Sequence, residues 1–121
     1  MGIYIGTPQD PITLHFGVDL QSDKCVMTIG NNRWDEQAQA ILQDVAIYTS
    51  EEALAAGEQP VVPNEFKNIL TYPGRIDLPC TTAEYWNYEG NNTALMTTKL
   101  ATAIYTAQPD WYGKLIPNFN F

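Results

Sequence analysis

Acid–base catalysis near neutral pH most often uses histidine, and this chain contains one histidine, His15. His15 falls on the polar side of an alternating segment, opposite Leu14 and Phe16, which predicts a surface or edge position. A single histidine without a nucleophile beside it is weak support for catalysis. We therefore expect His15 to have no catalytic role.

The candidate nucleophiles have structural explanations. Ser22 falls in a predicted turn and Ser50 at a predicted helix cap, and neither has the flanking small residues of a nucleophile elbow. Cys25 lies in an apolar strand-like run, and Cys80 has no basic neighbour in the sequence to activate it. The first six residues do not resemble a secretory signal, so we expect both cysteines to remain reduced thiols.

Motifs for metals and cofactors are also missing from the sequence. One histidine and two cysteines that are 55 positions apart cannot supply a standard structural zinc site. Asp19 and Asp23 flank a turn without the regular spacing of a calcium-binding loop. There is no glycine-rich phosphate loop and no dinucleotide fingerprint. We expect no metal, no cofactor and no enzymatic activity.

Composition narrows the class of protein. The chain has 121 residues, of which 45% are hydrophobic and 17% charged, enough for one hydrophobic core and without an apolar run that could span a membrane. Fourteen acidic and six basic residues give a formal net charge of −8, which argues against a nucleic-acid binder. The carboxylates are spread along the chain, so the charge is more typical of solubility than of recognition.

The first third of the sequence predicts β structure. Residues 13–20 alternate apolar and polar side chains, which is the period of a strand with one buried face. A turn at 21–24 and a second apolar run at 25–29 complete a predicted antiparallel hairpin, with residues 3–5 as a candidate third strand. Residues 30–32 are expected to end this sheet.

The rest of the sequence predicts mainly helices. Apolar spacing over 35–48 predicts an amphipathic helix that packs on the sheet. Capping-box patterns at 49–52 and 81–84 predict two further helix starts, and residues 75–78 predict a short strand. Residues 93–107 have helical spacing, but their threonines leave a pair of strands open as an alternative.

Together these elements predict an α+β protein: a small N-terminal antiparallel β-sheet, an amphipathic helix packed on it, and an extended C-terminal arm. Residues 1–109 are predicted to form a single domain, and residues 110–121 an extended aromatic arm. The arm is too apolar for a solvated tail, so its side chains must pack on their own domain or on a neighbour.

More than half of the aromatic residues fall in the last 40 positions. One interpretation is a core that closes late in the chain, because aromatic side chains bury large areas. The other is that some of them anchor a partner, because Trp and Tyr dominate binding hot spots. The candidate partner-binding residues are Trp111, Tyr112, Leu115, Ile116, Phe119, Phe121 and Trp86.

These observations favour a non-enzymatic structural or accessory subunit of a larger protein assembly. Small bacteriophage proteins are often acidic and rich in Asn and Thr, with aromatic arms, so the specific expectation is a phage head or tail component that binds its neighbours through the C-terminal arm. This is a similarity of composition and not of any motif. The expected partners are copies of the chain or other protein subunits, not nucleic acid or a membrane, and the expected location is the virion or the host cytoplasm.

Two alternatives stay open. A small acidic immunity or anti-defence protein would bind and block a basic partner, because excess negative charge speeds association with positive surfaces. A small nucleotide-binding protein or enzyme would need a site assembled in space, and Arg33 and Arg75 are the basic residues best placed for a phosphate.

Overall fold

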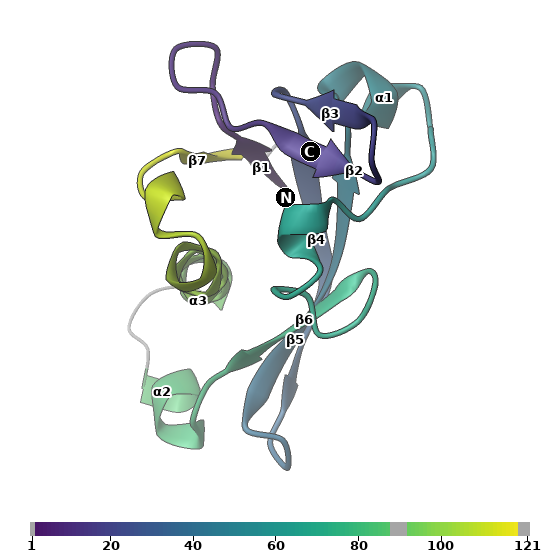
Figure 1. The fold of residues 1–121 in the computed structure, drawn as a ribbon. Coiled ribbons are helices and arrows are strands. Elements are labelled where there is room, and N and C mark those ends of the chain that lie inside the picture. Colours follow the sequence, from purple (N-terminus) through teal and green to yellow (C-terminus); the bar gives the residue numbers. More distant parts are fainter. Residues whose placement is uncertain (1, 88–91, 119–121) are drawn as a thin grey trace.

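The computed structural model describes residues 2–87 and 92–118, which fold into a strand-rich α+β structure (Figure 1). In chain order the elements are β1 (Gly2–Ile5), β2 (Leu14–Phe16), β3 (Leu20–Ser22), β4 (Val26–Asp35), β5 (Ala40–Tyr48), α1 (Glu51–Ala55), the 3₁₀ turn η1 (Asn64–Phe66), β6 (Arg75–Pro79), α2 (Thr82–Asn87), α3 (Asn92–Ala107), the 3₁₀ turn η2 (Pro109–Trp111) and β7 (Leu115–Asn118). The predicted α+β class is confirmed.

The main sheet has five strands in the order β6–β5–β4–β1–β7, and every neighbouring pair is antiparallel. A separate two-stranded sheet consists of β2 and β3. Long-range pairing therefore inserts the first strand between β4 and the last strand, so the two ends of the described chain are neighbours in the sheet.

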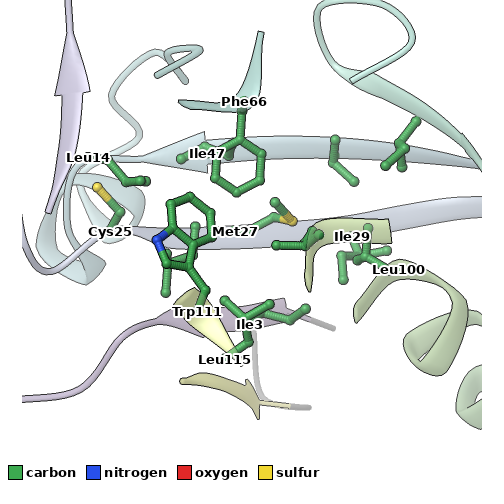
Figure 2. Close-up of a cluster of buried hydrophobic side chains, with 14 of the residues drawn as sticks. Ile3, Leu14, Cys25, Met27, Ile29, Ile47, Phe66, Leu100, Trp111 and Leu115 are labelled. Atoms are coloured by element: carbon green, nitrogen blue, oxygen red, sulfur yellow. The ribbon is translucent and has the colours of Figure 1, made fainter. Parts of the chain in front are cut away.

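The hydrophobic core lies against one face of the five-stranded sheet (Figure 2). Figure 2 shows Phe66 from η1 and Trp111 from η2 turned toward one another, with ring centroids 5.6 Å apart. Leu100 brings α3 onto the same core. The inward-facing strand residues that complete it include Ile3, Ile5, Met27, Ile29, Ile41, Val45, Ile47, Ile76, Leu78 and Leu115.

Several local predictions are confirmed. Ser50 caps α1, and its hydroxyl accepts a hydrogen bond from the Ala53 N–H (3.0 Å), which satisfies one of the free donors of the first turn. Strands β1 and β6 and the starts of α1 and α2 lie where the sequence placed them. Residues 93–107 belong to α3, so the helical alternative is correct for this segment and the strand pair is not.

The amphipathic helix predicted over 35–48 is wrong, because most of this segment forms β5. Ile41, Val45 and Ile47 point into the core with the period of two that a strand requires. Gln43 occupies the same inward row and is fully buried. A polar residue in the buried row hides the alternation, and the remaining apolar residues then match helical spacing by chance.

The strand predicted over 13–20 is interrupted. The chain turns at Gly17, which has a φ of +64°, and β2 and β3 form a hairpin on either side. Leu14 and Phe16 are buried, whereas Val18 is 97% exposed in the turn. The run at 25–29 consequently pairs with β1 and β5 and not with the alternating segment, which corrects the predicted hairpin.

The sheet also continues past the residues expected to end it. Between Gly30 and Arg33 the pairing of β4 with β5 shifts register, and Asn31 adopts a φ of +50°. This irregularity is a β-bulge, which adds a residue to one strand without ending the ladder. The bulge bends β4, which then runs on to Asp35.

Both edges of the five-stranded sheet are protected from further pairing. On β6, the Asp77 N–H donates to the Thr71 hydroxyl (2.9 Å), and Pro79 has no N–H. On β7, Pro117 lies opposite Ile3, and a proline in an edge strand keeps its nitrogen on the side away from the ladder. Each edge therefore lacks donors that another strand would need.

No helix among the described residues is long and apolar enough to cross a membrane.

Candidate protein-contact surface

The structure separates the seven residues predicted to bind partners. Trp111 and Leu115 are only 8% and 7% exposed and belong to the chain's own core. This placement follows the interpretation in which the core closes late in the chain. Because β7 pairs with β1, the segment from 110 to 118 is built into the fold and is not a free extension.

Three other residues of the predicted set have exposed side chains that a partner can reach. Trp86 is 70% exposed, Tyr112 78% and Ile116 41%. Phe119 and Phe121 lie outside the described residues. Large exposed side chains of this kind mark interaction sites when they are grouped and held in place.

Hydrogen bonds at the N-terminus of α2 are the first interactions that hold Trp86 in place. The Glu84 N–H donates to the Thr81 hydroxyl (3.1 Å) and the Thr81 N–H donates to the Glu84 carboxylate (3.0 Å), as the capping-box pattern predicted. Lys99 of α3 donates to the other oxygen of Glu84 at 2.6 Å and so ties the two helices together. This hydrogen bond from Lys99, followed by the one from Thr81, lowers the pKa of Glu84 from 4.5 to about 2.

A pair of hydrogen bonds between α2 and the β4–β5 turn also holds Trp86 in place. The Gln39 side-chain amide donates to the Thr82 hydroxyl (2.8 Å), and its oxygen accepts from the Thr82 N–H (2.8 Å). Gln39 itself has a φ of +50°, which is uncommon outside glycine. Sequence reasoning missed Gln39, because nothing near it in sequence indicates a partner 43 residues away.

An aromatic stack completes the support. The ring of Tyr85 lies parallel to the indole of Trp34, with centroids 4.7 Å apart and an angle of 5° between planes. Trp86 meets Tyr85 edge-on, with centroids 5.0 Å apart. Each such pair contributes about 0.5–1.5 kcal/mol beyond area burial, so the exposed indole stands on an ordered base.

Tyr112 is supported in a similar way from α3. Its ring lies 5.2 Å from that of Tyr105 at an angle of 56°. The turn that carries it is closed by backbone hydrogen bonds from the Tyr112 N–H to the Pro109 carbonyl (3.2 Å) and from the Lys114 N–H to the Trp111 carbonyl (2.9 Å). A residue that is 78% exposed is thus fixed on one side by another aromatic ring.

Between these two aromatic residues runs α3, whose exposed side is uncharged. Thr98, Thr102 and Thr106 are exposed at intervals of four residues, and Lys99 is the only charged residue of the helix sequence. Figure 1 shows α3 between α2 and the η2–β7 segment. We call Trp86, Tyr112 and these three threonines the helical surface. Depletion of charge with exposed aromatic residues is the composition of an interface centre.

His15 has a structural partner that the sequence did not reveal. Its backbone N–H donates to one oxygen of Glu65 (2.8 Å), and its ring Nδ1 lies 2.9 Å from the other oxygen. Partial burial opposes the charge on Glu65, but the hydrogen bonds from His15 outweigh it and lower the pKa of this carboxyl group. The pair fastens η1 to β2.

The other candidate reactive side chains are buried or paired within the chain. Cys25 and Cys80 are buried free thiols, and burial raises the pKa of each, which makes them poor nucleophiles. Arg75 donates to Asp77 at 2.8 Å and covers the ring of Tyr72, with 4.3 Å between its guanidinium carbon and the ring centroid. These partners oppose phosphate binding at Arg75.

Arg33 is also paired within the chain, because its Nη1 lies 3.3 Å from Asp44. Asn31 donates to the second oxygen of Asp44 (2.8 Å), and this hydrogen bond is the first reason that the pKa of Asp44 is lowered. Within residues 2–87 and 92–118, no group of three or more His, Cys, Asp or Glu side chains is placed to hold a metal ion.

Comparisons with known proteins add no relative: the chain matches no protein-family model, no curated protein and no solved structure.

Proposed function

We propose that this chain is a non-enzymatic structural or accessory subunit of a larger protein assembly, and that it binds neighbouring copies of itself through the helical surface. The observation that supports this proposal is the pair Trp86 and Tyr112. Both are largely exposed, both are held by ring contacts, and an uncharged helix side lies between them.

Both aromatic side chains of the helical surface are preorganised for binding. A binding surface gains little from an aromatic side chain that must first be ordered, because ordering costs about 0.5–1.5 kcal/mol per side chain. Trp86 stands on Tyr85, and Tyr112 rests on Tyr105, so much of that ordering is already in place. The sheet edges, by contrast, are poor contact sites because prolines and internal hydrogen bonds remove their donors.

A bacteriophage head or tail is the assembly we propose, with the virion or the host cytoplasm as the location. The support is compositional: the chain is acidic and rich in Asn and Thr, and it displays aromatic residues. The sequence of α3 has one charged residue, Lys99, which pairs with Glu84, so the side of the helix that carries the three threonines is uncharged and suited to close contact between like copies.

The test is the mass of the purified chain in solution. Sedimentation over a range of concentrations should show species heavier than the 13.6 kDa chain, and Trp86→Ala with Tyr112→Ala should shift them to monomer. Val18→Ala is the matched control, since Val18 is 97% exposed in the β2–β3 turn, outside the helical surface. A strict monomer, or equal effects of the double variant and the control, would overturn the proposal. Deleting residues 110–121 is unsuitable, because Trp111 and Leu115 are part of the core.

A further inference from the structure

A groove of about 510 Å³ opens on the other face of the sheet, away from the core. Tyr4 lies between the inward-facing residues Ile3 and Ile5, so alternation along β1 places its ring on this outer face. The groove is bounded by the loop at 6–11, the β3–β4 connection and the first turn of α1. Its volume is within the range of sites that bind small groups.

The walls of the groove are ordered by their own hydrogen bonds. In the loop, the backbones of Thr7 and Asp10 donate to each other's carbonyl groups (both 3.1 Å), and Lys114 lies 3.3 Å from the Asp10 carboxylate. The α1 wall is held by the Ser50 cap. A preformed site loses less free energy to ordering when it binds.

The groove joins an apolar lining to an acidic rim. Pro8, Pro11 and Val26 contribute apolar lining. The charged lining residues are Asp23, Glu51, Glu52 and Lys24, all of them exposed, so negative charge is in excess. The hydroxyl of Tyr4 donates to Glu51 at 3.3 Å and helps to orient that carboxylate.

This combination fits a side chain with an apolar stem and a cationic end. Lysine and arginine bury their methylene groups along apolar surface while the charged group meets carboxylates at the rim. Opposite charge across a contact also speeds association and sets its orientation. A free anion would be repelled by the three carboxylates, and an apolar ligand would offer them no opposite charge.

A second feature indicates that the cation belongs to a protein. Ile116 of β7 lies directly opposite Tyr4 in the sheet register and is 41% exposed, so its side chain is beside the groove on the same face. We propose that the groove binds a lysine or arginine side chain of a partner protein, whose adjoining residue covers Ile116. This proposal concerns the sheet face and does not depend on the helical surface.

The first experiment uses synthetic peptides and the full chain. A ten-residue peptide of Gly and Ser with one central Arg-Leu pair is titrated into the protein, and backbone amide shifts are followed by NMR. We expect shifts at Tyr4, Lys24 and Glu52. Binding should weaken as the salt concentration rises, because the distance over which exposed charges attract falls to about 10 Å at 0.1 M salt. A peptide with citrulline in place of arginine keeps the shape without the charge and should bind at least about tenfold more weakly.

Matched variants locate the charge that matters. Glu51→Gln with Glu52→Gln should weaken binding of the arginine peptide about tenfold, while Glu36→Gln with Asp110→Asn, the same charge change elsewhere, should alter it less than about twofold. Lys24→Gln should strengthen binding, which a merely destabilised protein would not do. Thermal unfolding of each variant checks that the fold is kept.

Three results would overturn the proposal. Equal binding of the citrulline peptide would show that charge is not recognised, and equal losses in the two double variants would show that only net charge attracts. Putrescine binding as tightly as the arginine peptide would show that a free diamine suffices and that no partner protein is required. None of these results bears on sedimentation of the Trp86 and Tyr112 variants, so the two proposals fail separately.

Discussion

The indole of Trp34 stacks on the ring of Tyr85 with centroids 4.7 Å apart and planes within 5° of parallel. The two residues come from β4 and α2, so this contact, with the hydrogen bonds of Gln39, joins the helix to the far end of the sheet. Because Trp86 follows Tyr85 directly, the stack also fixes the exposed indole of the helical surface.

Replacing Tyr85 should therefore affect both stability and the position of Trp86. Tyr85→Ala is expected to lower the free energy of unfolding by about 2–3 kcal/mol, because ring burial and stacking are lost together. Urea unfolding followed by near-ultraviolet circular dichroism measures this change. Tyr85→Phe keeps the ring and is the control. If Tyr85→Ala and Tyr85→Phe were equally stable, the stack would contribute nothing to the docking of α2.

Gln43 is expected to destabilise the fold. It is fully buried in the inward row of β5, and neither atom of its amide has a hydrogen-bond partner within the described part of the chain. Gln43→Met has a similar length and no amide, and should raise the free energy of unfolding by about 1–2 kcal/mol in guanidinium titrations. Gln39→Met is the control, because it removes an amide that does have partners and should destabilise. A loss of stability in Gln43→Met would show that its amide is satisfied in solution.

The same residue shows why part of the fold could not be predicted from the sequence. Caps and turns are local signals, so α1 and α2 could be placed from Ser50 and from Thr81 with Glu84. The period of β5 was hidden by Gln43, and only the neighbouring strands reveal it. Buried polar residues of this kind break the pattern on which strand prediction depends.

The candidate contact surface, like the fold, could be predicted only in part from the sequence. The sequence identified the aromatic residues near the C-terminus, but it could not separate buried Trp111 from exposed Tyr112. That separation depends on the pairing of β7 with β1, in which Ile116 lies opposite Tyr4, more than one hundred positions away in sequence. Long-range register of this kind has no local signature in a strand of four residues.

The pKa of Glu84 predicts how stability responds to acid. The hydrogen bond from Lys99 lowers this pKa from 4.5 to about 2. The folded state therefore stabilises the ionised form of Glu84, and the unfolded state does not. This contribution is complete above pH 4.5 and is lost as the pH falls from 4.5 towards 2. Carbon-13 NMR of the Glu84 carboxyl group should show a midpoint near the lower value.

A variant isolates that contribution. Glu84→Gln should make the free energy of unfolding depend less steeply on pH between 4.5 and about 2. The control is Glu36→Gln, which removes an exposed carboxylate from the β4–β5 turn and should preserve the steeper dependence. Identical pH profiles for wild type and Glu84→Gln would contradict the role given to Lys99.

The two cysteines should be inert in the folded protein. Cys25 and Cys80 are buried, and burial raises the pKa of both thiols, so little thiolate is present at neutral pH and access is blocked. With Ellman's reagent we expect the native chain to react very slowly. In about 6 M guanidinium, which unfolds most proteins fully, two thiols should react rapidly. Rapid native reaction would mean that β4 or the end of β6 opens readily.

Pro117 is expected to limit association through the edge strand β7. Pro117→Val would give β7 an N–H on the side away from β1 and complete a row of groups able to pair with another strand. We expect faster growth of thioflavin-positive aggregates on heating, with little change in the free energy of unfolding, because the residue is exposed. Pro60→Val, the same substitution in the loop after α1, should aggregate like wild type. If the two variants aggregated alike, hydrophobicity would explain the effect and the missing donor of Pro117 would not.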